Sequence, residues 1–132
     1  MATSVTFDDI VRFLRKEGWT FAIGEADSIA LVVRGSGQSY SLLIRYPWEK
    51  EIIAAYVEYP FRVPPEKSGV MLDLAARINL GLLFATCEYD RDREKVRFRS
   101  VMLTDDAPFH EEQFSTMLAA ALSIAETLLQ IL

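Results

Sequence analysis

Hydrophobic residues recur along this chain with two different spacings, and the changes of spacing predict its secondary structure. Near the start, Ile10, Phe13 and Leu14 lie on one face of a helix, which Thr6 can cap and Gly18 is expected to end. From residue 19 to residue 59 the spacing becomes two, which is typical of strands. Short segments of turn residues separate four alternating runs, at 19–23, 29–33, 40–46 and 53–59. We therefore predict four antiparallel strands joined by hairpins.

The second half of the chain predicts a helix, a hairpin and another helix. Pro60, Pro64 and Pro65 end the sheet, because proline cannot donate to a strand ladder. The next helix is expected to end near residues 79–81, and its apolar face comprises Val70, Met71, Leu74, Ala75 and Ile78. Strands at 82–89 and 94–103 flank a turn at 90–93, and a long apolar helix runs from about 110 to 132.

Together these elements predict an α+β fold in a single domain, residues 1–132. We expect an antiparallel sheet of about six strands in the order α-ββββ-α-ββ-α, with the helices packed on one face.

The last hairpin is the most highly charged part of the chain, reading EYDRDREKVRFRS at residues 88–100. A turn at 90–93 sets Cys87 opposite Val96 and Ala85 opposite Phe98 on one face. The opposite face then carries most of the charge, with Glu88 against Lys95.

The charges in this hairpin nearly cancel, which favours a solvated hairpin stabilised by cross-strand pairs of opposite sign. An alternative is a surface that contacts nucleic acid, since Lys95, Arg97 and Arg99 share one face with Phe84 in the predicted register.

Composition narrows the class of protein. The chain has 132 residues, a net charge of −5 and a quarter of its residues charged, which argues against nonspecific binding to nucleic acid or to an anionic membrane. Its one cysteine rules out an intrachain disulfide. The first residues lack the basic and apolar regions of a signal peptide, and no apolar run approaches the length of a membrane span. We expect a cytoplasmic protein.

Several apolar residues fall on positions that the predicted helices do not cover. The outer face of a half-solvated antiparallel sheet is expected to be polar. On the last helix, Phe114, Leu118, Ala121, Leu122 and Ala125 belong to an apolar stripe wider than one sheet face usually covers. The candidate partner-binding residues are therefore Leu43, Ile52, Tyr56, Phe84, Val101, Leu103, Leu118 and Leu122. Trp48, in the YPWEK turn, is a further aromatic residue outside the expected core.

No residue pattern predicts catalysis, and no cofactor or metal is expected. His110 is the only histidine, and we expect the imidazole or Asp106 to cap the last helix. Cys87 falls on the predicted core face, where a thiol is inert. The segment RGSGQS lacks the register of a phosphate-binding loop. Acidic side chains near residue 110 could hold magnesium but more simply favour a helix N-terminus: Asp105, Asp106, Glu111 and Glu112.

The order of elements and several segments resemble one known family. These segments are IVRFLRKEGW near the start, YPFRVPP, and ARINLGLLFATCEYDRDREKVRFRS before the last helix. Together they resemble the YbjN family of bacterial proteins, over residues 6 to 130. The resemblance implies a fold similar to that of class I type III secretion chaperones, which bind extended segments of partner proteins, commonly as dimers. The turn DRDRE departs from the glycine-containing turn usual in the family, which bears on the geometry of the hairpin.

The sequence as a whole favours a non-catalytic, chaperone-like or regulatory protein that binds other proteins, as a homodimer. Two alternatives stay open. A nucleic-acid accessory protein would use Lys95, Arg97 and Arg99, and a small-molecule sensor would need a pocket between the sheet and the second helix.

Overall fold

The helices and strands follow one another in the predicted order, α-ββββ-α-ββ-α. The computed structural model describes residues 7–35, 37–46, 51–104 and 109–129. Its elements are α1 (Phe7–Lys16), β1 (Ala22–Ile23), β2 (Ser28–Arg34), β3 (Ser39–Arg45), β4 (Ile52–Glu58), the 3-10 turn η2 (Pro65–Lys67), α2 (Ser68–Gly81), β5 (Thr86–Asp90), β6 (Lys95–Leu103) and α3 (Glu111–Leu128).

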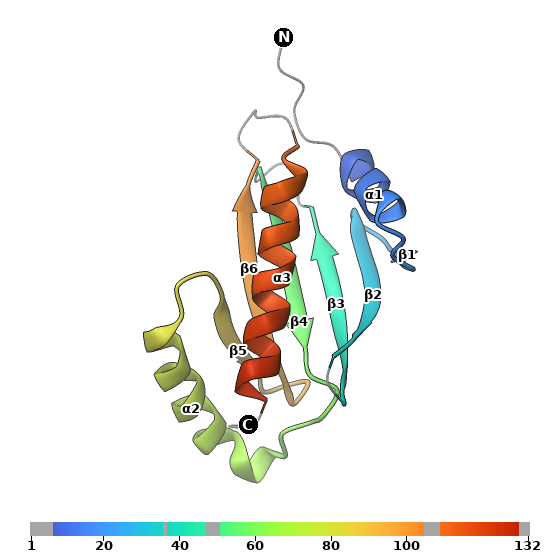
Figure 1. The fold of residues 1–132 in the computed structure, drawn as a ribbon. Helices are drawn as coiled ribbons and strands as arrows, with labels where there is room; N and C mark the ends of the chain where they lie inside the picture. Colours follow the sequence, from blue (N-terminus) through green and yellow to red (C-terminus); the bar gives the residue numbers. More distant parts are fainter. Residues whose placement is uncertain (1–6, 36, 47–50, 105–108, 130–132) are drawn as a thin grey trace.

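The strands form one open six-stranded sheet in the order β1-β2-β3-β4-β6-β5, and every neighbouring pair is antiparallel. This confirms the predicted α+β class and the predicted sheet. The first four strands are successive hairpin neighbours, and β6 then pairs with β4, which leaves β5 as an edge strand (Figure 1).

The core lies between α3 and one face of the sheet, called the inner face below. The alternating positions that the sequence marks as apolar point to this face, and Ile29, Leu42, Ile53 and Phe98 are each at most 1% exposed. The long helix α3 runs along β4 and β6 on the inner face (Figure 1) and buries one stripe of its own: Phe114, Met117, Leu118, Ala121 and Ala125.

The short helix α1 packs at the start of α3. The ring of Phe13 meets the rings of Phe109 and Phe114 edge-on, with centroids 6.1 and 5.4 Å apart. On the surface, Lys16 Nζ lies 2.6 Å from a carboxylate oxygen of Glu111.

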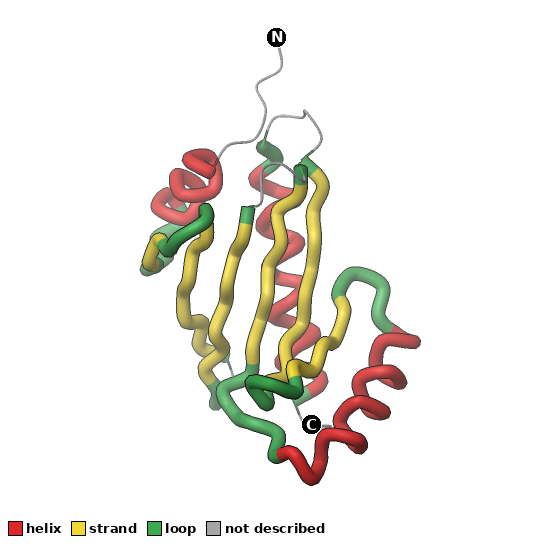
Figure 2. Tube along the Cα trace, turned by 180° about the vertical axis from the view of Figure 1, so that it is seen from behind, coloured by secondary structure: helices red, strands yellow, loops and turns green. Residues whose placement is uncertain are grey.

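The other face of the sheet, called the outer face below, has no described helix across it. Figure 2 views the molecule from that side and shows the strands in front of α3. The remaining helix, α2, lies beside the edge strand β5 instead of on a face (Figures 1 and 2).

The first strand is much shorter than the predicted run of residues 19–23, because the end of α1 uses part of that run. Gly18 has a φ of +79°, its N–H donates to the carbonyl of Arg15, and the N–H of Trp19 donates to the carbonyl of Leu14. This pair of bonds is a Schellman motif that closes the helix. Trp19 and Phe21 pack on the core from outside the strand, and only Ala22 and Ile23 pair with β2.

The register of the last hairpin also differs from the prediction, by two residues. Cys87 lies opposite Phe98, and Glu88 lies opposite Arg97. The side chain of Asp90 accepts bonds from the N–H groups of Asp92 and Arg93, so the turn begins one residue later than predicted. A shift of two residues leaves each side chain on its predicted face, so Cys87 and Phe98 both point inward.

The predictions for helix caps and helix ends can be compared with the structure where the residues are described. His110 precedes α3, but its side chain makes no capping bond, so the predicted imidazole cap is wrong. Thr6, Trp48, Asp105 and Asp106 lie outside the described residues. The second helix ends at Gly81, as predicted, and Pro65 opens the turn that precedes it.

One buried hydroxyl connects the sheet to α3. Tyr59 follows β4, is 1% exposed, and donates a hydrogen bond from its hydroxyl to the carbonyl of Ala125 in α3. Its ring also stacks on Phe61 and meets Phe98 edge-on. Burial raises the pKa of this phenol well above its ordinary value of 10.0.

Replacing Tyr59 with phenylalanine should lower the free energy of unfolding by about 1–3 kcal/mol, because the buried Ala125 carbonyl loses its donor. Urea unfolding measures this change. The matched control is Tyr89→Phe, whose half-buried hydroxyl lies 3.3 Å from the carbonyl of Val63 and should matter less. Equal losses in the two variants would contradict a special role for Tyr59.

The same phenol should make stability depend on pH in the alkaline range. Its pKa is near 10 in the unfolded chain and higher in the folded one, so above pH 10 deprotonation favours the unfolded state. Stability should therefore fall as pH rises above about 10, and Tyr59→Phe should reduce the slope. A slope that is the same in both proteins would contradict this prediction.

Candidate functional site

An apolar stripe crosses the outer face of the sheet diagonally. The strand pairings align its members in successive rows: Val32, then Ala30, Leu43 and Tyr56, then Ala54 and Val101, then Ile52 and Leu103. We call these eight residues the outer stripe. Val32, Val101 and Leu103 are 68%, 48% and 74% exposed. The stripe therefore runs from β2 to β6 over a face that the described chain leaves open to solvent.

One end of the outer stripe is hollowed into a groove of about 320 Å³. Its apolar lining includes Val32, Leu43 and Tyr56. Arg93, Arg97 and the Glu58 that pairs with Arg93 also line it, with Ser41 of β3. The guanidinium of Arg97 lies 4.4 Å above the ring of Tyr56. An apolar floor beside cationic groups suits a ligand that carries both apolar and acidic groups.

Basic side chains border the outer stripe on both sides. On the β6 side, Arg97 and Arg99 share the carboxylate of Glu88, at 2.8 and 3.3 Å. Arg93 makes two hydrogen bonds of 2.9 and 3.0 Å to Glu58. These pairs hold the three guanidinium groups in fixed positions.

Two further arginines border the stripe without such partners. Arg45 lies on β3 in the same row as Ala54 and Val101, and Arg34 lies on β2 beyond Val32. Neither makes an ion pair within the described part of the chain. Their positive charge is thus available to a partner.

The structure brings together five of the eight residues predicted to bind a partner. Leu43, Ile52, Tyr56, Val101 and Leu103 all belong to the outer stripe, at the face assigned to them by the alternation of the sequence.

The other three lie elsewhere. Phe84 precedes β5, so it does not share a strand face with the basic residues as predicted. Leu118 is 3% exposed and packs in the core, so it cannot present a surface in this fold. Leu122 is half-buried against the core.

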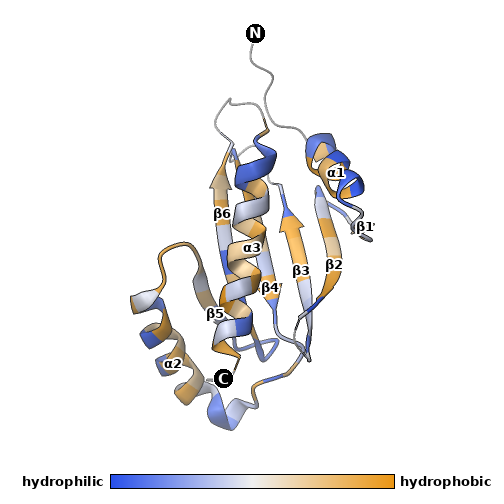
Figure 3. Cartoon of the chain, in the orientation of Figure 1, coloured by the Kyte–Doolittle hydropathy of each residue, from blue (hydrophilic) through white to orange (hydrophobic). Residues whose placement is uncertain are grey.

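A second exposed apolar surface lies on α2 and the loop after it. Leu72, Ala76 and Leu80 follow one another at intervals of four residues, so they share a face of the helix. Leu80 and Leu83 are each 90% exposed, and Phe84 is 74% exposed. We call these five residues the α2 patch. The loop from α2 to β5 is correspondingly coloured hydrophobic in Figure 3.

The edge of β5 is partly closed by a side chain from α2. The side-chain amide of Asn79 accepts a bond of 2.7 Å from the N–H of Cys87 and donates one of 3.0 Å to its carbonyl. These are the two bonds that a neighbouring strand would make, so Asn79 occupies the place of another strand. A partner is therefore hindered from adding a strand at this point.

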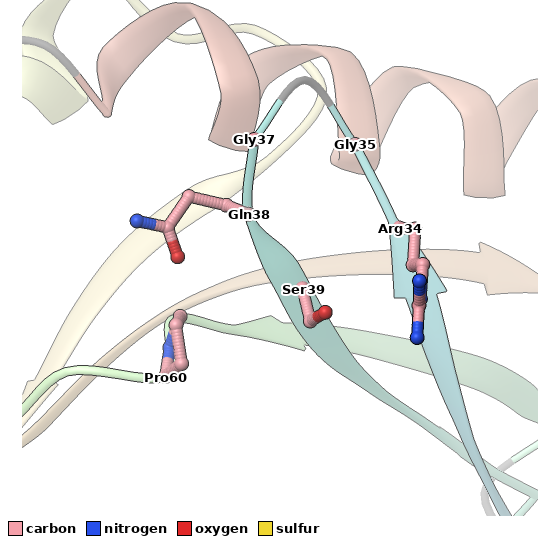
Figure 4. Close-up of a pocket in the computed structure, with 6 residues that line it drawn as sticks. All are labelled: Arg34, Gly35, Gly37, Gln38, Ser39 and Pro60. Atoms are coloured by element: carbon pink, nitrogen blue, oxygen red, sulfur yellow. The ribbon is translucent and has the colours of Figure 1, made fainter.

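Two more hollows in the described structure are polar. One, of about 510 Å³, lies at the β2–β3 hairpin and is lined by Arg34, Gln38, Ser39 and Pro60 with two glycines (Figure 4). The other, of about 330 Å³, lies between the start of α2 and the β5–β6 turn, with Ser68, Tyr89 and Arg91 in its wall. The second is the place where the predicted sensor pocket would be, between sheet and second helix.

The groups considered for chemistry lie apart from these surfaces. Cys87 is 3% exposed, and burial raises the pKa of its thiol to about 11, so it is not a thiolate at neutral pH. His110 is exposed. Among the described residues, His, Cys, Asp and Glu side chains form no group of three that could hold a metal ion. In the same part of the chain, no helix has the length and apolar character needed to cross a membrane.

Sequence comparison places this fold in a family. Residues 6–130 match the family YbjN, described as "Putative bacterial sensory transduction regulator". The chain belongs to the YbjN family. No curated protein matches its sequence.

Solved structures of similar fold include a YbjN protein and two secretion chaperones. Escherichia coli YbjN, described as "a putative transcription regulator", is 15% identical with a TM-score of 0.69, over 93% of this chain and 87% of that one. The structure of the SchA–HopA1 chaperone–effector complex is 11% identical with a TM-score of 0.63, over 92% of this chain and 91% of that one. The Yersinia pestis type III secretion chaperone SycH was solved in complex with a fragment of YscM2. It is 18% identical with a TM-score of 0.62, over 93% of this chain and 99% of that one. At these identities the likeness shows a shared fold.

Sequence reasoning missed several residues of this YbjN-family chain that shape its surfaces. The alternation of β2 and β3 already assigns Val32, Arg34 and Arg45 to the outer face, so these three could have been found. The positions of Asn79 and Leu80 relative to β5 depend on how α2 packs, and no local pattern reveals them.

Removing the Asn79 side chain should expose the backbone of Cys87. We expect Asn79→Ala to lower the free energy of unfolding by about 1–3 kcal/mol, because two backbone groups lose their partners. Hydrogen exchange of the Cys87 amide should accelerate more than exchange at the centre of the sheet. The control is Asp73→Ala, which removes only an exposed ion pair with Arg77 and should change stability by less than about 0.5 kcal/mol. Unchanged exchange at Cys87 would contradict the role given to Asn79.

Proposed function

We propose that this YbjN-family protein is a non-catalytic protein-binding module, chaperone-like or regulatory, that holds a segment of another protein on the outer face of its sheet. The observation that carries the proposal is the outer stripe: apolar side chains aligned across four strands and left uncovered by the described helices. A contiguous exposed apolar surface rimmed by polar residues is characteristic of interaction sites.

The solved structures of the same fold support a protein partner. SchA was solved in a complex of chaperone and effector, and SycH with a fragment of another protein, YscM2. Each pairs this fold with a bound polypeptide. For the present chain the family description and the uncovered face point in the same direction.

The nucleic-acid alternative is weaker, because the predicted basic strand is already engaged. Lys95 donates to the carbonyls of Tyr59 and Pro60, and Arg97 and Arg99 both bind Glu88. Binding to phosphates would have to compete with these contacts.

We also propose that the protein forms a homodimer through the α2 patch. The buried side of α2 is Met71 and Ala75, with Leu74 and Ile78 partly buried, and the patch adds apolar residues on a further part of the helix surface. A helix that is apolar around most of its circumference is normally buried on more than one side. A second copy, related by twofold symmetry, would cover both patches at once.

The function is tested by identifying what co-purifies with the tagged protein from the lysate of its own organism. We expect one or two proteins in fixed ratio that stay bound in high salt, and their loss in the variant Leu43→Ser/Val101→Ser. The control Val70→Ser alters a side chain that is 72% exposed but lies outside both surfaces, and should retain the partner. Recovery of nucleic acid that salt releases, with no stoichiometric protein, would contradict the proposal.

The dimer is tested by sedimentation of the purified protein. Leu80→Glu should weaken self-association by about 2 kcal/mol or more, roughly 30-fold in the dissociation constant, because it places a charge in the centre of the interface. Leu103→Glu, an equally drastic change on the outer face, should leave the dimer intact. A wild-type protein that sediments as a monomer, or a dimer broken by Leu103→Glu alone, would contradict this interface.

A further inference from the structure

The charge of the outer face is opposite to that of the whole chain. Among the described strand residues, five basic and three acidic side chains belong to this face, a net charge of +2, whereas the chain carries −5. The basic ones are Arg34, Arg45, Lys95, Arg97 and Arg99, and the acidic ones are Glu58, Glu88 and Asp90. The charges of the β5–β6 turn, Arg91, Asp92, Arg93 and Glu94, cancel one another.

The positions of these charges follow the outer stripe. Arg97 and Arg99 lie on its β6 side, Arg45 lies on its β3 side, and Arg34 lies beyond its β2 end. A ligand lying along the stripe would thus meet apolar side chains beneath it and guanidinium groups on both flanks. The single carboxylate of Glu88 pairs with the guanidinium groups of both Arg97 and Arg99. Arg34 and Arg45 have no ion pair among the described residues. N–H donors of these arginines therefore remain for the carboxylates of a ligand.

The shape of the surface favours a helix. A sheet face offers side chains, not backbone groups, so an extended segment laid on it would find no partners for its own N–H and C=O groups. A helix satisfies these groups internally, and α3 already packs in this way on the inner face. The stripe spans three row intervals and three strand spacings, about 25 Å, which is the length of a helix of about 16 residues.

We propose that the outer stripe binds an amphipathic helix of another protein, whose apolar face is flanked by glutamate or aspartate side chains. This proposal rests on the function proposed above and specifies the chemistry of the partner. The apolar face of the helix packs on Leu43, Tyr56 and Val101, and its carboxylates pair with Arg45 on one flank and with Arg97 or Arg99 on the other.

Other occupants fit this surface less well. A second copy of the chain would place one basic face against another, and like charges repel. Anionic lipid or nucleic acid is recognised by a cluster of several free cations, whereas the two arginines of this face without an ion pair among the described residues, Arg34 and Arg45, lie at opposite ends of the β2–β3 ladder.

A displayed peptide library tests the proposal. The probe is a phage library of helical peptides about 18 residues long, with a fixed leucine stripe and flanking positions drawn from glutamate, lysine and serine. After panning on the wild-type protein, we expect glutamate to be enriched over lysine on both flanks. Enrichment of lysine or serine, or no enrichment over panning on the Val101→Ser/Leu103→Ser protein, would overturn the proposal.

Variants locate the site. For an enriched peptide, Arg45→Glu should weaken binding on the order of tenfold and should also reduce its dependence on salt. Arg77→Glu, an exposed arginine on α2, is the matched control and should change binding less than twofold. Both substituted side chains are exposed, and a cooperative unfolding transition shows that each variant folds. Loss of binding in Leu80→Ser but not in Val101→Ser would move the site to the α2 patch and overturn the assignment.

The outcome can be separated from the function proposed above. If a co-purified protein still binds Leu43→Ser/Val101→Ser and Arg45→Glu, the chain is a protein-binding module whose site lies elsewhere, and only the present inference fails. Wild-type binding to phosphatidylserine vesicles or to short DNA that Arg34→Glu and Arg45→Glu abolish, without enrichment of acidic peptides, would assign the face to lipid or nucleic acid instead.

Discussion

The packing of α3 on the inner face of the sheet is the contact on which the rest of this structure depends. One helix of 18 residues runs along β4 and β6 and buries a single stripe, from Phe114 to Ala125. The hydroxyl of Tyr59 binds a carbonyl of the same helix, which connects the end of β4 to the C-terminal half of α3. Because burial of apolar area is the main stabilising term, this layer determines which face of the sheet is dry.

With α3 on the inner face, no helix of the described residues covers the outer face. The longest described helix, α3, lies on the inner face, and the other two described helices lie at the start of α3 and along β5. The outer stripe is therefore a consequence of how many helices the fold supplies. Surface pairs such as Arg93 with Glu58 organise the charges around the stripe but add little stability of their own.

The edges of the sheet are less accessible to a partner than its outer face. At β5, Asn79 binds both backbone groups of Cys87, which hinders another strand from pairing there. At the opposite edge, β1 is only two residues long, since the Schellman motif at Gly18 uses the residues before it. Edges that are partly closed by Asn79 and partly paired by β1, beside an open face, favour recognition of side chains over recognition of backbone.

Local sequence determined the element order, the class of the fold and the face of each strand residue. The period of two places Leu42 and Ile53 inside and Leu43 and Tyr56 outside, because successive side chains of a strand point to opposite faces. The sequence also predicts where the first two helices end, at Gly18 and Gly81.

Tertiary structure alone decided the rest. The place of Phe84 depends on how α2 meets β5, and the burial of Leu118 depends on how α3 packs on β4 and β6. Glu88 of β5 pairs with arginines of β6, and Glu58 of β4 pairs with Arg93 of the β5–β6 turn, so these ion pairs join different elements. A periodic pattern states which way a side chain points, but which surfaces are covered depends on contacts between residues far apart in the chain.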